Sequence, residues 1–285
     1  MAFTFKFTAE HVADILHLDA AAAKEWFEAM EEVLPKYEIT TPERVAGFIA
    51  QTGHESGGYK TLTENLNYSS DALNKIFPKY FVKAGRDATA YHRQPEKIAN
   101  VIYAGRMANG DTASGDGWRF RGGGILQLTG RENYTNFGKS VGMTAEQATD
   151  YVRTPKGAIE SACWFWKTNG LNKYCDSNDI LTMTKRINGG TIGLEDRTKH
   201  WNHAMELFTG KAAPKAAVAE SAATTTLKKG SKGELVKKMQ AVLGVAQDGD
   251  FGPGTEAKVK AWQTKNGLTA DGIVGPKTLA KMGIK

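Results

Sequence analysis

Two glutamates that lie close together in the sequence could perform acid–base chemistry. Glu55 ends an apolar-periodic run within FIAQTGHESGGYKTLTENLNYS, residues 48–69, and Glu64 follows nine residues later in the polar stretch TENLN. Hydrolysis of a glycosidic bond needs two such carboxyl groups, one to protonate the leaving oxygen and one to activate a water molecule. The two glutamates are therefore the candidate catalytic pair.

A helix that begins near residue 42 must position Glu55. Thr41 is a capping residue and Pro42 favours the first helical position, while Gly57 and Gly58 are expected to end the helix. Its apolar face is predicted at Val45, Phe48, Ile49 and Thr52. Because Glu55 follows Thr52 by three residues, we expect its carboxyl to enter the core and to be partly desolvated, which suits a proton donor. The polar surroundings of Glu64 suit a base.

Other interpretations of these residues involve a metal or an ion pair. His54-Glu55 could begin the HExxH motif of zinc proteases, but Gly58 stands where the second histidine would be, which excludes that motif. Glu55 could also be a structural carboxylate paired with an arginine. No metal and no cofactor is predicted. Cys163, on the apolar face of a predicted helix, is expected to be buried and inert; whether it pairs with Cys175 is open.

Polar side chains that could surround the glutamates occur further along the chain. The segment WRFRGGGILQLTGRENY, residues 118–134, places Gln127, Thr129 and Asn133 around a glycine-lined turn, where they could contact a sugar and a water. His54 and Arg197 are candidates for orienting the carboxylates, although Arg197 could equally be a surface residue. Aromatic residues that could stack on sugar rings, or belong to the core, are Tyr68 and the cluster from Trp164 to Trp166.

Four ordered motifs between residues 40 and 205 resemble the family 19 glycoside hydrolases, the chitinase-like fold, and in particular their short phage endolysin branch. The motifs are HES around Glu55, the second glutamate Glu64, FRGGGILQLT at residues 120–129, and INGG at residues 187–190. The resemblance implies that Glu55 is the general acid and Glu64 the general base. It also implies that the Thr129 hydroxyl helps to hold the water and that the amides of Gln127, Asn133 and Asn188 bind sugar.

The chain departs from the plant chitinases of this family. Those enzymes have many more residues between their two glutamates, so the short spacing here indicates missing loops and a more open cleft. Chitin specificity is therefore not carried over.

Helical spacing dominates the elements that must hold these residues. Apolar faces at helical spacing are predicted twice more, at Ile159, Ala162, Cys163 and Trp166, and at Ile180, Met183, Thr184 and Ile187. Thr8 caps another run through Val12, Ile15 and Leu16. Alternating strand patterns are scarce. We expect a mostly α, lysozyme-like catalytic domain with two lobes.

The charge distribution divides the 285 residues into two domains. Residues 1–226 hold 26 Lys+Arg and 26 Asp+Glu, whereas residues 227–285 hold 11 lysines and 5 acids, which accounts for the net charge of +6. An Ala/Thr-rich segment, residues 211–226, separates them and is predicted to be a linker. The predicted domains are therefore residues 1–210 and 227–285. Such a basic domain suggests a polyanionic partner, namely nucleic acid, a membrane surface or a cell-wall polymer, or it only aids solubility.

The smaller domain contains a repeat. DGDFGPGT at residues 248–255 returns as DGIVGPKT at residues 271–278, and each copy predicts a turn followed by a capped helix. Core positions are predicted at Val236, Met239, Leu243, Ala257, Ala261 and Trp262. The segment from Gly230 onward resembles the three-helix peptidoglycan-binding domain attached to many wall hydrolases. Turn chemistry explains most of the repeated residues without ligand contact.

These observations predict a modular endolysin that hydrolyses β-1,4 glycosidic bonds of bacterial peptidoglycan with inversion, as a monomer. Its partner would be peptidoglycan, not nucleic acid. Two alternatives are a chitinase of the same family and a non-catalytic wall-binding or virion structural protein.

The start, MAFTFKFTAEHV, lacks a basic segment followed by an apolar one, and no run of 18 uncharged apolar residues occurs. We therefore expect synthesis in the host cytoplasm without a signal peptide, no stable membrane insertion, and action on the cell wall after a separate membrane-permeabilising protein allows release.

Overall fold

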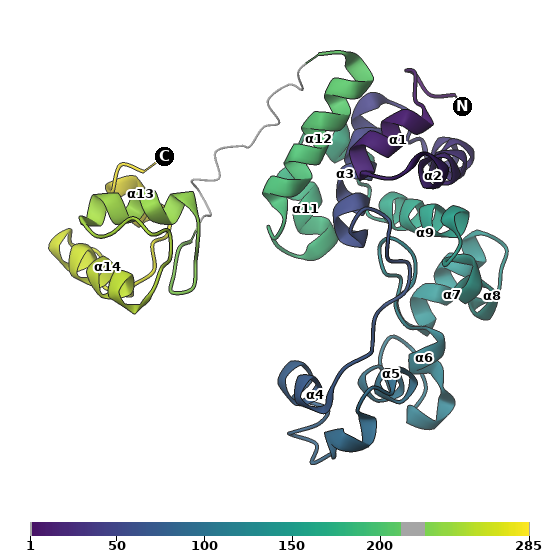
Figure 1. The fold of residues 1–285 in the computed structure, drawn as a ribbon, viewed down its shortest axis with the longest axis horizontal. Helices are drawn as coiled ribbons and strands as arrows, with labels where there is room; N and C mark the ends of the chain where they lie inside the picture. The colour runs from purple at the N-terminus through teal and green to yellow at the C-terminus, as the bar shows by residue number, and fades with distance from the viewer. Residues whose placement is uncertain (1, 212–225, 285) are drawn as a thin grey trace. The chain divides into compact units, whose positions relative to one another are not determined.

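The computed structural model describes residues 2–211 and 226–284, and the chain divides into two compact units, Met1–Ala216 and Ala217–Lys285 (Figure 1). In these ranges every regular element is a helix, and β structure is limited to isolated bridges. The prediction of a mostly α protein is confirmed. Of the predicted linker, residues 212–225 lie outside the described ranges. None of the described helices is long and apolar enough to cross a lipid bilayer.

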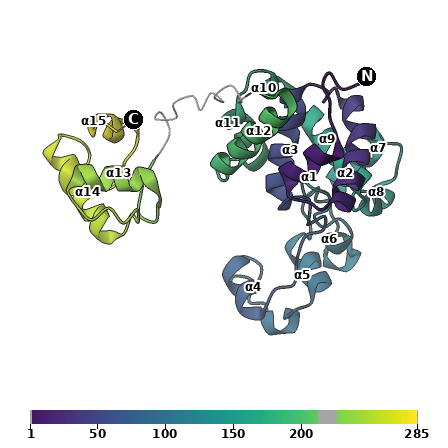
Figure 2. The same cartoon turned by 45° about the horizontal axis from the view of Figure 1, so that its top comes forward.

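The first unit contains a large helical lobe (Figures 1 and 2). Its helices are α1 (Ala9–Leu16), α2 (Ala20–Val33), η1 (Leu34–Tyr37), α3 (Pro42–Ser56), α9 (Pro155–Thr168), α10 (Asn172–Asp176), α11 (Ile180–Asn188) and α12 (Leu194–Thr209). They share one hydrophobic core.

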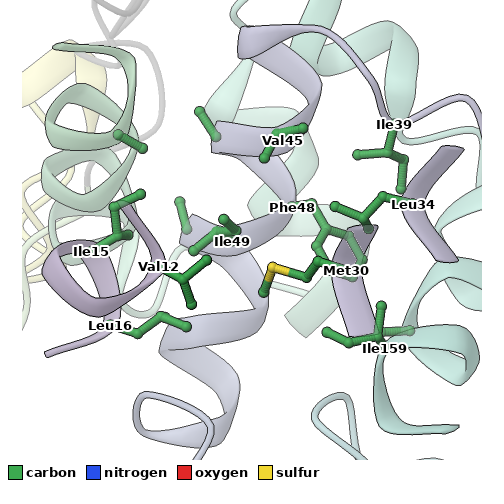
Figure 3. Close-up of a cluster of buried hydrophobic side chains, with 14 of the residues drawn as sticks. Val12, Ile15, Leu16, Met30, Leu34, Ile39, Val45, Phe48, Ile49 and Ile159 are labelled. Carbon is green, nitrogen blue, oxygen red and sulfur yellow. The ribbon is translucent and has the colours of Figure 1, made fainter. Parts of the chain in front are cut away.

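Helix α3 runs through the middle of this core, as Figure 3 shows for Val45, Phe48 and Ile49. All three residues are 0% exposed, and burial of each such side chain stabilises the fold by about 1.5–3 kcal/mol. Thr41 accepts a hydrogen bond from the Arg44 amide at the start of the helix, as the sequence predicts. The core therefore fixes the position of the helix that ends beside Glu55.

Helices α3 and α12 approach each other closely at Gly47. A Cβ atom on Gly47 would lie 2.5 Å from the Cys175 sulfur and 2.8 Å from the Trp201 ring. Both neighbours are buried in the core, so neither can move aside cheaply. The glycine thus allows α12 to pass alongside α3 as far as the end that carries Glu55.

A smaller lobe follows Glu64 in the sequence and has its own core. It comprises α4 (Ser70–Ile76), η2 (Ala88–Tyr91) and α5 (Pro95–Ile102), which pack around Leu73, Phe81 and Ile98. Figures 1 and 2 show α4 and α5 set apart from the helices of the large lobe. Next to α5 lie η3 (Thr112–Ser114) and α6 (Asp116–Arg119), and a third cluster around Phe120, Tyr134 and Phe137 packs α7 (Arg131–Ser140) with α8 (Ala145–Tyr151). The predicted two-lobed form is confirmed.

The glycine-rich loop at residues 122–124 holds the segment that carries Glu64. The Gly124 amide donates to Leu62 O at 2.9 Å, and the Glu64 amide donates to Gly122 O at 3.0 Å. A Cβ atom on Gly123 would lie 2.6 Å from the Tyr134 hydroxyl. Only glycine fits at residue 123. The loop can therefore pack against both the segment that carries Glu64 and the helix that carries Tyr134.

The second unit is a small bundle of α13 (Glu234–Leu243), α14 (Pro253–Lys265) and α15 (Pro276–Lys281). Its separate core includes Val236, Met239 and Phe251. The prediction that Ala257 and Ala261 face this core is wrong, because both are exposed.

The buried face of α14 carries polar residues, and hydrogen bonds explain why. Gln263 is 1% exposed; its amide nitrogen donates to Asp271 at 2.8 Å, and its amide oxygen accepts from the Gly272 amide at 2.9 Å. Gln240 holds the first copy of the repeat in the same way, through Asp248 and the Gly249 amide. Each buried glutamine therefore fixes one D-G turn, a structural role that hydrophobic periodicity alone does not reveal.

Candidate active site

The carboxylate of Glu55 lies against a buried arginine. Glu55 Oε1 is 2.5 Å from Arg197 Nη2, and the two side chains are 29% and 2% exposed. The prediction that this carboxyl enters the core is wrong. Gly53 and Ser56 in the last turn of α3 are buried, but the Glu55 side chain points to the partly exposed side of this turn, where Arg197 meets it. The Glu55 side chain therefore combines partial access to solvent with a fixed cationic neighbour.

A chain of buried polar side chains fixes Arg197 in turn. Arg197 Nη1 donates to Gln51 Oε1 at 2.6 Å, and the Gln51 amide donates to Thr184 Oγ1 at 3.0 Å. All three residues are 0–1% exposed. The alternative that Arg197 is a surface residue is therefore wrong. A buried guanidinium with several acceptors keeps one orientation, and so does the carboxylate that it holds.

The residues next to this pair form a second contact between the same two helices. His54 Nδ1 lies 2.6 Å from Asp196 Oδ2, and this hydrogen bond lowers the pKa of Asp196. A Cβ atom on Gly193 would lie 2.2 Å from His54 Nε2, so the imidazole packs directly on the backbone before α12. His54 therefore contacts Asp196 and not a catalytic carboxylate; its predicted orienting effect on Glu55 would act through α12.

Glu64 is held by two donors from the small lobe and the glycine-rich loop. Tyr103 Oη donates to Oε1 at 2.6 Å, and the Gly122 amide donates to Oε2 at 3.1 Å. Burial, followed by the hydrogen bond to Glu64, raises the pKa of Tyr103, so the phenol keeps its proton and remains a donor. Each carboxylate oxygen accepts one hydrogen bond, which leaves lone pairs for a water molecule.

Gln127, Thr129 and Asn133 form a linked set close to Glu64. A Cβ atom on Gly122 would lie 2.6 Å from Gln127 Oε1 and 3.3 Å from Glu64 Oε2, so both side chains border the same space. Thr129 Oγ1 donates to Gln127 O at 2.8 Å, and Asn133 Nδ2 donates to Thr129 O at 2.8 Å. The structure thus brings four of the predicted site residues together.

These three residues also line a pocket of about 320 Å³. Its other walls come from Trp164, Phe165 and their neighbours on α9, together with Met107. Trp166, by contrast, is 1% exposed and belongs to the core. Of the aromatic cluster proposed for stacking, Trp164 is therefore accessible and Trp166 is not.

Asn188 and Tyr68 contact other parts of the first unit. Asn188 Nδ2 donates to Ile192 O at 2.8 Å and its Oδ1 accepts from the Gly190 amide, so its amide holds the loop between α11 and α12. Tyr68 packs edge-on against Phe77 in the small lobe, with ring centroids 5.2 Å apart. Their roles in substrate binding stay predictions.

Sequence reasoning missed Gln51, Tyr103 and Asp196. Gln51 could have been noticed, because it is a polar residue inside the apolar run of α3 and lies one helical turn before Glu55. Tyr103 follows Glu64 by 39 residues in the sequence, and no local sequence pattern predicts their contact.

Within residues 2–211 and 226–284, no three His, Cys, Asp or Glu side chains are grouped to hold a metal ion. Cys163 and Cys175 are buried free thiols.

Comparison with known proteins identifies two relatives of this chain. A Haemophilus influenzae protein named "Glycosyl hydrolase family 19 domain-containing protein" is 40% identical over 184 residues, which cover 65% of this chain and 90% of that protein. An Arabidopsis thaliana endochitinase is 29% identical over 168 residues, 58% of this chain and 46% of the endochitinase. The chain thus spans less than half of that plant protein.

Two further comparisons concern the C-terminal unit and the fold. The peptidoglycan binding domain family matches residues 233–282. Chitinase C from Streptomyces griseus is a structure with a TM-score of 0.49 and 15% identity, covering 74% of this chain and 79% of that one.

Proposed function

The chain belongs to glycosyl hydrolase family 19, and from this premise we propose that it hydrolyses the β-1,4 glycosidic bonds of bacterial peptidoglycan. The observation that carries the proposal is the different way in which the two glutamates are held. Glu55 is bound through one oxygen to a buried arginine, and in the described part of the chain its Oε2 has no hydrogen-bond partner. Glu64 is oriented by neutral donors on both oxygens.

In the proposed reaction, Glu55 is the general acid and Glu64 the general base. Protonated Glu55 gives its proton to the glycosidic oxygen as the bond breaks. Glu64 removes a proton from a water molecule, which attacks the anomeric carbon from the opposite face of the sugar. Two carboxyl groups that act on opposite faces invert the configuration at that carbon.

Thr129 is suited to hold the attacking water. Its hydroxyl proton is used in the hydrogen bond to Gln127 O, so its oxygen can only accept from the water. The other proton of that water would then point to Glu64. The side chains of Gln127 and Asn133 would bind the sugar next to this water, and Tyr68 and Asn188 would contact more distant sugar units.

Peptidoglycan is proposed as the substrate because of the second unit. A peptidoglycan binding domain on the same chain raises the local concentration of the hydrolase at its polymer. The second candidate substrate is chitin, favoured by the name of the Arabidopsis relative.

We propose further that the protein is a monomeric phage endolysin. It would be made in the host cytoplasm, reach the wall after a separate protein permeabilises the membrane, and cause lysis of the host cell.

The test is mass spectrometry of purified peptidoglycan after digestion, with the new reducing ends labelled. The expected products are muropeptides with new reducing sugars and intact peptide stems, and none with Glu64→Gln. Chitin oligomers are digested in parallel. Turnover of chitin alone, or release of free peptides from the wall, would contradict the proposal.

A further inference from the structure

The small lobe concentrates positive charge within a catalytic unit that is neutral in total. Residues 65–110 contain seven Lys and Arg residues and three Asp and Glu residues. The cations are Lys75, Lys79, Lys83, Arg86, Arg93, Lys97 and Arg106. None of the salt bridges in the described ranges involves any of them. This lobe, which contains α4 and α5 in Figure 2, therefore carries a net positive charge, and its cations are not held in ion pairs.

A continuous series of contacts leads from Glu64 to these cations. Tyr103 donates to Glu64, and the Arg106 guanidinium lies 6.0 Å from the centre of the Tyr103 ring. Arg106 Nη1 donates to Tyr80 Oη at 3.1 Å, and Lys79 Nζ lies 5.3 Å from the centre of the Tyr80 ring. Cations and tyrosines thus alternate outward from the proposed base.

Arg93 lies beside the chain segment that directly follows Glu64. Its Nη1 donates to Asn67 O at 2.6 Å, and its amide donates to Tyr68 O at 2.8 Å. Arg93, Arg106 and Lys79 are all exposed. We call these three residues the cationic edge.

The partners of the cationic edge determine which ligand it fits. Arg93 is held by a carbonyl oxygen, and Arg106 by a carbonyl oxygen, the Tyr80 hydroxyl and the ring of Tyr103, none of which carries a full negative charge. Each guanidinium has five N–H donors and uses only one nitrogen in these bonds, so a carboxylate can still bind with two charge-assisted hydrogen bonds.

We propose that the cationic edge binds carboxylates of the peptide stems of peptidoglycan and so makes the enzyme prefer an anionic glycan to a neutral one. The inference rests on the proposed function, because it concerns the same polymer substrate. Chitin carries no carboxylate, whereas each peptide stem ends in one and carries others along its length. The charges of the small lobe would therefore distinguish the two polymers at the glycan strand itself, independently of the second unit.

The test measures binding of soluble peptidoglycan fragments to the full chain carrying Glu55→Gln, which prevents turnover. Each fragment is used in its native form and after its carboxylates have been converted to methylamides. We expect the native form to bind at least ~10-fold more tightly than the amide form, since two charge-assisted hydrogen bonds are lost. When Arg93→Gln and Arg106→Gln are added, the ratio of the affinities for native and amide fragments should fall close to one. Binding should also depend less on salt.

Two matched double variants remove the same charge elsewhere. Lys97→Gln with Lys139→Gln removes exposed lysines outside the cationic edge, and Lys238→Gln with Lys258→Gln removes exposed lysines of the second unit. Both should keep the preference for native fragments. The inference is overturned if the parent shows no preference, if the ratio survives the loss of Arg93 and Arg106, or if the second-unit variant abolishes it. Hydrolysis of the native fragments by the unsubstituted chain tests the proposed function separately.

Discussion

Arg197 Nη2 lies 2.5 Å from Glu55 Oε1, and the residue before Arg197 pairs with the residue before Glu55. Two successive residues of α12 thus hold two successive residues of α3. The arginine is the buried member of the two contacts, since its side chain is 2% exposed, whereas that of Asp196 is 53% exposed. The orientation of the proposed acid therefore depends mainly on Arg197.

Replacing Arg197 with lysine should damage both stability and activity. Lysine keeps the charge but cannot contact Gln51 and Glu55 at once in the geometry of a guanidinium, so buried acceptors lose their donor. We expect a decrease of about 2–4 kcal/mol in the free energy of unfolding, measured by urea denaturation. Activity at a temperature where the variant is folded should also fall. Full activity of the folded variant would show that Arg197 has a structural role only.

Glu55→Gln should preserve the fold and remove the activity. The amide and the acid are nearly isosteric, and the amide oxygen can still accept from Arg197, but the amide cannot donate a proton to a leaving oxygen. Hydrolysis should fall by at least ~10²-fold, measured as release of reducing ends from peptidoglycan. Circular dichroism serves as the control for folding. A folded variant with unchanged hydrolysis would remove Glu55 from the mechanism.

The stereochemistry of the first product should report inversion. If Glu64 activates water on the face opposite to Glu55, the initial product is the α-anomer, and the two carboxyl groups should lie about 6.5–9.5 Å apart. Proton NMR during the first minutes of hydrolysis distinguishes the anomers before they equilibrate. A β-anomer that appears first would refute the inverting reaction.

The sequence predicts the helices well because their signals are local. Thr41, Pro42 and Gly57 mark both ends of α3, and the structure places the helix between them. The Glu55 side chain shows where local signals fail. Helical periodicity places Glu55 on the buried face. The structure buries Ser56 in the same turn but leaves Glu55 partly exposed beside Arg197, an outcome that tertiary contacts decide.

Contacts between distant segments could not be predicted in the same way. The Tyr103–Glu64 contact spans 39 residues and the Arg197–Glu55 contact spans 142, so neither has a characteristic spacing. The wrong prediction that Ala257 and Ala261 of α14 face the core has a different cause. Gln263 occupies a core position because it hydrogen-bonds a turn, and a search for apolar residues at helical spacing does not find it.

The stability of the first unit should depend on pH through Asp116. This carboxylate is 3% exposed, and hydrogen bonds from Arg131, followed by one from the Gly110 amide, lower its pKa against the opposing effect of burial. The pKa of Asp116 is thus lower in the folded protein than in the unfolded chain, where it is about 3.9, so ionised Asp116 stabilises the fold at pH values above 3.9. This stabilisation is lost as the pH falls through the pKa of Asp116 in the folded protein.

Asp116→Asn is therefore expected to lower the free energy of unfolding by about 2 kcal/mol at pH 7. This loss is smaller than that for a fully buried ion pair, because Arg131 is about one-third exposed. Below the folded-state pKa of Asp116 the difference from the unsubstituted protein should disappear. Urea denaturation at several pH values measures it. A difference that stays constant down to pH 2 would mean that lost packing, and not charge, causes the effect.

The second unit should attach the enzyme to the wall without contributing to the chemistry. It has a separate core, so residues 227–285 alone are expected to fold and to sediment with purified sacculi. Residues 1–210 alone should cleave soluble fragments at the rate of the full chain but act more slowly on intact walls, because they lose the raised local concentration.

Salt provides the check on how the second unit binds. Its 11 lysines and 5 acids make part of the attachment electrostatic, and exposed charges are screened over roughly 8 Å at physiological ionic strength. Sedimentation of residues 227–285 with sacculi should therefore decrease as salt is raised. If the isolated unit stays in the supernatant beside sacculi at low salt, its lysines do not bind the wall, and the slower action of residues 1–210 would need a different cause.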